Sequence, residues 1–176
     1  MSALLRATAR PALFALGLLL GAPALAQNAP PPAPAAPAAA APAITAAEAL
    51  AAWDRFRAAP EEKLSEAPTF LKFMQGGEVH TVLRSDVVFW MYQAFPQDVQ
   101  AVLYAAYMGG NLDSQLRGKK QGDDPVAGMN AALDAWAVLK KTHPKLSIPL
   151  LDKWEQARRE GRLAAALDAG AGTSAP

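Results

Sequence analysis

The sequence predicts an all-α protein, a compact bundle of about six helices preceded by an N-terminal leader. Apolar side chains recur at helical spacing, and the clearest stripe runs from residue 99 to residue 107, at i, i+3, i+4, i+7 and i+8. Capping residues, prolines and glycine pairs divide such stripes into segments of helical length. No two segments have the alternating pattern of paired strands, so we expect helices throughout.

Residues 1–26 have the order of a cleavable secretory signal peptide. Arg6 and Arg10 make the start basic, residues 12–20 are apolar, and Ala24-Leu25-Ala26 supplies the small residues that signal peptidase needs. Retention as a membrane anchor is the alternative, but the apolar core is shorter than the ~20 residues of a span. We expect an exported, periplasmic or secreted protein without a transmembrane segment after cleavage.

Residues 27–43 are almost entirely alanine and proline, which predicts an extended, disordered linker. The helical domain is expected over residues 44–168, and a short disordered tail over residues 169–176. The chain has no cysteine, which excludes disulfides, thiolate catalysis and zinc–thiolate sites. Without the two arginines of the leader, 15 basic and 16 acidic side chains remain, and no basic run is present. This charge excludes nucleic acid as a partner.

Local signals predict where the first helices begin and end. Thr45 and Glu48 form a capping-box pattern, and the helix that they open stops before Pro60. A second helix begins at Pro68 and ends at Gly76-Gly77. A third spans residues 85–95, and its six apolar residues in a row predict a central buried helix. A buried strand is the alternative for so short a run.

The second half of the chain predicts three more helices. The stripe at residues 99–107 belongs to a helix that starts at Pro96 and ends at Gly109-Gly110. A polar loop follows over residues 111–124, in which residues 112–116 are a candidate for one short helical piece. Pro125, after two aspartates, opens a fifth helix that ends by His143. Ser147 is expected to cap a sixth that runs toward residue 167, where Gly161 is a candidate break.

An internal repeat suggests how these helices are arranged. Ala49-Leu50 and Ala52-Trp53 return as Ala132-Leu133 and Ala135-Trp136, and a Lys-Leu-Ser triplet follows each copy. The repeat predicts two pseudo-equivalent helical hairpins around the central apolar helix, with both tryptophans buried. Chance alignment in an alanine-rich chain is the alternative.

No catalytic or metal-binding motif is present. The two histidines, His80 and His143, lack the spacing of a metal site, and we expect no metal and no cofactor. Aromatic residues concentrate in the middle of the chain, where a core or an apolar ligand site would need them. The candidate binding residues are Trp90, Tyr92, Tyr104 and Tyr107.

These observations favour an exported module that acts by binding, with an envelope protein or a small apolar ligand as its partner. The alternative is a small periplasmic enzyme that uses Glu78 and His80 together with loop carboxylates. The candidate carboxylates are Asp113, Asp123 and Asp124.

Overall fold

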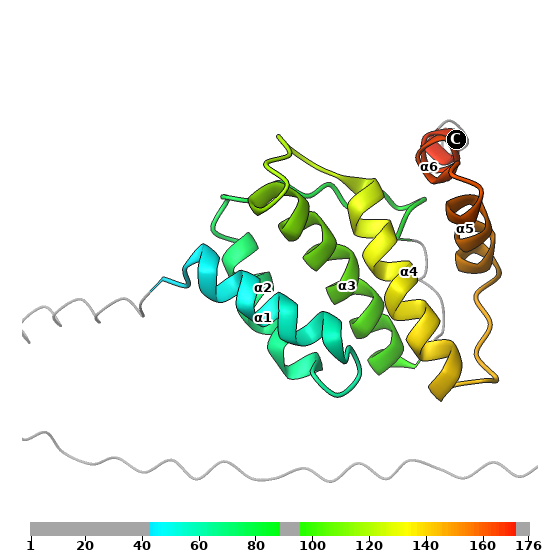
Figure 1. The fold of residues 1–176 in the computed structure, drawn as a ribbon, viewed down its shortest axis with the longest axis horizontal. Coiled ribbons are helices and arrows are strands. Elements are labelled where there is room, and N and C mark those ends of the chain that lie inside the picture. Colours follow the sequence, from blue (N-terminus) through cyan, green and yellow to red (C-terminus); the bar gives the residue numbers. More distant parts are fainter. Residues whose placement is uncertain (1–42, 89–95, 172–176) are drawn as a thin grey trace, which may run out of the picture. The chain divides into compact units, whose positions relative to one another are not determined.

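Residues 43–88 and 96–171 are described by a computed structural model (Figure 1). All regular structure in these ranges is helical, which confirms the predicted all-α bundle of about six helices. The elements are α1 (Ala46–Ala58), a 3-10 turn η1 (Leu64–Glu66), α2 (Ala67–Met74), α3 (Gln97–Leu116), α4 (Pro125–Thr142), α5 (Pro149–Arg159) and α6 (Leu163–Ala171). The predicted signal peptide lies outside the described residues, as does the predicted linker up to residue 42.

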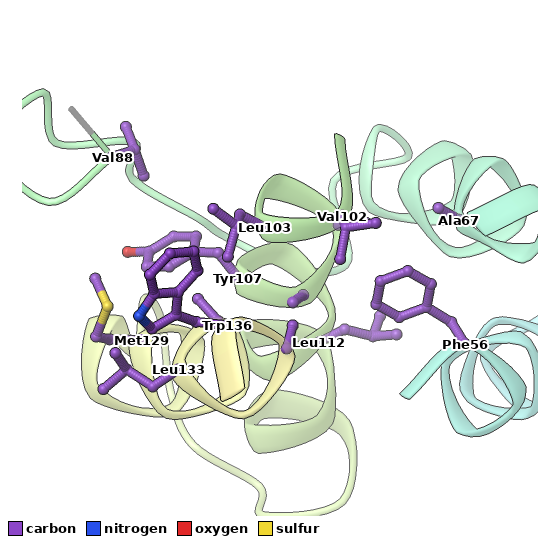
Figure 2. Packing of buried hydrophobic residues seen from close by; sticks show 14 of the residues in the cluster. Phe56, Ala67, Val88, Val102, Leu103, Tyr107, Leu112, Met129, Leu133 and Trp136 are labelled. Atoms are coloured by element: carbon purple, nitrogen blue, oxygen red, sulfur yellow. The ribbon is translucent and has the colours of Figure 1, made fainter. Parts of the chain in front are cut away.

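Helix α3 lies at the centre of the described fold. It packs against α1 and α2 on one side and against α4 on the other, and its interface with α4 is the most extensive in the domain. Helices α5 and α6 pack on each other and on α4 (Figure 1). Figure 2 shows Leu103 and Tyr107 projecting from α3, with Leu133 and Trp136 projecting from α4. All four side chains are fully buried.

The predicted ends of α1, α2 and α4 are confirmed to within a residue or two. The Thr45 hydroxyl accepts a hydrogen bond from the Glu48 amide, and the Glu48 carboxylate accepts one from the Thr45 amide, so the capping box is complete. Asp124 caps α4 by accepting a hydrogen bond from the Ala127 amide at 3.1 Å. These signals act over three or four residues, which is why the sequence alone reveals them.

Gly109 and Gly110 do not end a helix, as we had expected. Helix α3 continues through both to Leu116 and takes in part of the predicted loop. Both glycines are buried: a Cβ at Gly109 would lie 2.0 Å from the Trp53 ring, and one at Gly110 would lie 2.5 Å from the Ala127 carbonyl oxygen. Here glycine allows close packing of α1 and α4 on α3.

The predicted third helix is described only at its start. Residues 85–87 form turns, in which the amides of Val87 and Val88 donate to the Arg84 carbonyl, and both valines are buried. Residues 89–95 lie outside the described residues, so a helix there stays a prediction. The central place in the described fold belongs to α3.

The sixth predicted helix is two helices. Gly161, with φ of +67°, separates α5 from α6, which confirms it as the break. Ile148 is the N-cap residue of α5 and no side chain caps this end, so the expected Ser147 cap is wrong. Helix α6 extends to Ala171, beyond the boundary expected at residue 168.

Both repeated tryptophans are buried, as predicted, but their surroundings differ. Trp53 packs against the rings of Phe56 and Phe70, and its indole N–H has no acceptor among the described residues. The Trp136 indole N–H donates to Asp152 at 3.0 Å. The equivalence of the two hairpins stays a prediction.

Candidate functional site

A groove of about 480 Å³ lies where α1 and α4 flank α3. Trp53, Phe56 and Pro60 form its wall on the α1 side, and Val138 lines it on the α4 side. Small side chains between these walls leave the space open. They are Ala106 and Gly110 on α3 and Ala127, Ala131 and Ala135 on α4.

Close packing of α3 and α4 shapes the groove. A Cβ at Gly110 would lie 2.8 Å from the Ala131 Cβ, so the two helices approach closely where both carry small side chains. Ala127, Ala131 and Ala135 follow one another at i, i+4 and i+8 and therefore share one face of α4. The hollow is a consequence of helix geometry and residue size.

Ion pairs surround this groove. Asp54 and Asp113 each pair with both Arg57 and Arg117, which ties α1 to the end of α3. The hydrogen bond from Arg117 lowers the pKa of Asp54. On α4, Asp134 pairs with Arg158 of α5 at 2.7 Å.

The side chains of the groove are suited to binding. Arg57, Asp113 and Asp134 line it, and ion pairs already engage all three. Ser114 donates its hydroxyl to Asp124 at 2.6 Å. The Asn130 side chain makes no hydrogen bond within the described ranges, which leaves its amide open to a ligand. An apolar hollow with a few polar groups is typical of small-molecule sites.

The structure separates the tyrosines that the sequence grouped together. Tyr107 is fully buried, and burial raises the pKa of its hydroxyl. It packs where α4 has Gly128, because a Cβ there would lie 2.9 Å from the Tyr107 ring. Tyr104 is partly buried and lines a pocket of about 230 Å³ together with Met74 and Met108. Tyr107 therefore belongs to the packed interface between α3 and α4 rather than to the pocket that Tyr104 lines.

Trp90 and Tyr92 lie outside the described residues. The binding role assigned to these two residues and to the two tyrosines of α3 stays a prediction. Trp53 and the alanines of α4 were not among the predicted site residues. The spacing of the three alanines at residues 127, 131 and 135 was the only sequence signal for the groove. Small residues at such spacing are common in helix interfaces, so the spacing did not indicate a binding site.

The residues of the enzymatic alternative have other partners. Glu78 and His80 are exposed, and the His80 backbone is hydrogen-bonded by the side chain of Gln115. Asp113 belongs to the ion pairs of α1 and α3, and Asp124 caps α4.

The pKa of the Asp123 carboxyl is raised above its ordinary value. Its burial is the main cause, opposed by the facing Val82 amide. Over the described ranges, no three His, Asp or Glu side chains gather as metal ligands would.

None of the described helices is long and apolar enough to cross a membrane. Comparison of the chain with protein-family models, with curated proteins and with solved structures finds no match. A proposal for the function must therefore start from the groove and the side chains that line it.

Proposed function

We propose that this protein is an exported, non-enzymatic helical module that binds a small apolar ligand in the groove between α1 and α4. The observation that carries the proposal is the hollow of about 480 Å³ over the small side chains of α3 and α4. Its volume lies within the range of roughly 300–1,000 Å³ that ligand sites occupy. The leader of residues 1–26 supports export.

The walls of the groove favour an apolar molecule. Trp53 and Phe56 line the groove although both are buried in the domain, and the small side chains beside them are apolar as well. Burial of apolar surface is the main favourable term in the binding of an apolar ligand. The charged groups at its edge already neutralise one another, so no single unpaired charge is available to attract an ionic ligand. Asn130 supplies a hydrogen-bonding amide for a ligand with one polar group.

Filling the groove tests this proposal. Ala131 lines the groove and is only partly buried, so Ala131→Leu would place a larger side chain in the hollow. The probe is N-phenyl-1-naphthylamine, an uncharged apolar dye whose fluorescence rises in an apolar site. We expect saturable binding to the purified wild-type protein and an affinity loss of about tenfold or more in Ala131→Leu.

Ala164→Leu is the matched control, because Ala164 is exposed on α6 and lines none of the pockets described here. It should bind the dye as the wild type does. Circular dichroism melts of both variants would establish that they are folded. Absence of saturable dye binding by the wild type, or equal affinity in folded Ala131→Leu, would overturn the proposal.

A further inference from the structure

Glu61, in the turn that follows α1, is hydrogen-bonded to the C-terminal end of α4. Its Oε2 accepts a hydrogen bond from the Thr142 hydroxyl at 2.6 Å, and its Oε1 lies 2.8 Å from the His143 Nε2. One carboxylate thus engages two consecutive residues, the last residue of α4 and its C-cap. These two contacts are called the Glu61 bridge below.

The Glu61 bridge lies beside the groove. Pro60, which lines the α1 side of the groove, directly precedes Glu61, and Val138, which lines the α4 side, lies one helical turn before Thr142. Helices α1 and α4 each pack on α3. Among the described residues, no other hydrogen bond or ion pair joins α1, or the turn after it, to α4. The bridge is therefore the polar contact that connects the two walls directly.

The bridge can break without leaving a buried polar group unpaired. The Thr142 hydroxyl lies 3.2 Å from the Leu139 carbonyl oxygen of its own helix, so it has a second acceptor when Glu61 moves away. The side chains of Glu61 and His143 are 28% and 38% exposed, so water can solvate both. Water competes for the partners of such exposed pairs, which is why they contribute little to stability. These are the features of a contact that opens while the helices stay folded.

We propose that the Glu61 bridge controls access to the groove: the walls separate when the bridge breaks, and the ligand enters and leaves in that state. This role rests on the ligand site proposed above. The ion pairs of Asp54 and Asp113 hold α1 on the end of α3 rather than on α4, so they do not oppose the movement. Loss of the bridge should therefore raise both the association rate and the dissociation rate of a ligand.

Thiol labelling measures the opening of the groove without any ligand, because the chain has no cysteine of its own. Ala135 lines the groove but is only 1% exposed, so Ala135→Cys should react with dithiobis(nitrobenzoic acid) when the walls separate. Ala105→Cys, at an equally buried position that does not line the groove, is the matched control. Its labelling requires opening of the core and therefore reports a loss of overall stability.

We expect Glu61→Ala to speed the labelling of Ala135→Cys about fivefold, which corresponds to ~1 kcal/mol, and to leave that of Ala105→Cys unchanged. Thr142→Val, which removes the hydrogen-bond donor from the other wall, should act in the same direction. Unchanged labelling of Ala135→Cys, or equal acceleration at both positions, would overturn the proposal.

The kinetics of dye binding distinguish this role from the ligand site itself. In Glu61→Ala, the association and dissociation rates of N-phenyl-1-naphthylamine should both rise by about the same factor as the labelling rate. Dye rates equal to those of the wild type would overturn control of access by the bridge. If the wild type binds no dye, the ligand site is wrong, and the labelling rates still decide whether the bridge holds the walls together.

Discussion

The close approach of Trp53 to Gly109 predicts that Gly109→Ala destabilises the protein, whereas helix propensity alone predicts that it stabilises the protein. In the middle of a helix, replacing glycine with alanine stabilises by about 1 kcal/mol. At Gly109 the new Cβ would lie 2.0 Å from the Trp53 Cε3 and 2.2 Å from its Cζ3. The ring is only 4% exposed and packs against Phe56 and Phe70, so it cannot move aside freely.

Overpacking of a core costs about 1–3 kcal/mol, and contacts this short belong at the upper end. After the gain in helix propensity, Gly109→Ala should lower the free energy of unfolding by about 2 kcal/mol. Urea denaturation followed by circular dichroism at 222 nm measures this change. Ala101→Gly, on a less buried face of the same helix, measures the effect of helix propensity alone. It should lower the free energy of unfolding by about 1 kcal/mol.

The decisive variant removes the ring. Trp53→Leu keeps an apolar side chain but vacates the space of the six-membered ring that faces Gly109. In that background Gly109→Ala should stabilise the protein, because only the propensity gain of about 1 kcal/mol remains. If Gly109→Ala changes the free energy of unfolding in the same direction in both backgrounds, the Trp53 ring is not the reason for glycine at this position and our reasoning is refuted.

Asp124→Ala should lower the free energy of unfolding by about 1–2 kcal/mol, since it removes the N-cap of α4 and the acceptor of Ser114. Ser147→Ala should leave it unchanged, and urea titrations that showed equal losses would contradict this assignment. Asp123→Asn should raise the free energy of unfolding at neutral pH. Burial raises the pKa of Asp123 in the folded state above its ordinary value of 3.8. The wild type therefore loses stability as the pH rises from 3.8 through the folded-state pKa, and the variant does not. The advantage of the variant should vanish at about pH 3, and a constant advantage in denaturation curves would argue against burial as the cause. We predict that export removes residues 1–26, so mass spectrometry of the mature chain should find Gln27 as its first residue. A membrane-bound chain that retains Met1 would contradict this prediction.

The ends of several helices could be predicted from the sequence because each depends on neighbouring residues. The reciprocal hydrogen bonds of Thr45 and Glu48 span three positions, and Asp124 caps a helix whose first residue is Pro125. Gly161 adopts a positive φ that other residues avoid, so its role as a break was also readable. These interactions form within a single turn of chain, and no distant segment changes them.

Only the tertiary structure determined the roles of Gly109, Gly110 and Tyr107. A glycine pair can end a helix or allow two helices to touch, and the choice depends on what packs against it, which here is Trp53 and α4. Tyr107 lies on an apolar stripe in the sequence, but its complete burial depends on Gly128, 21 positions further along the chain. The groove likewise requires α1, α3 and α4 together. Long-range packing cannot be read from local spacing, because side-chain volumes on different helices decide which helices meet.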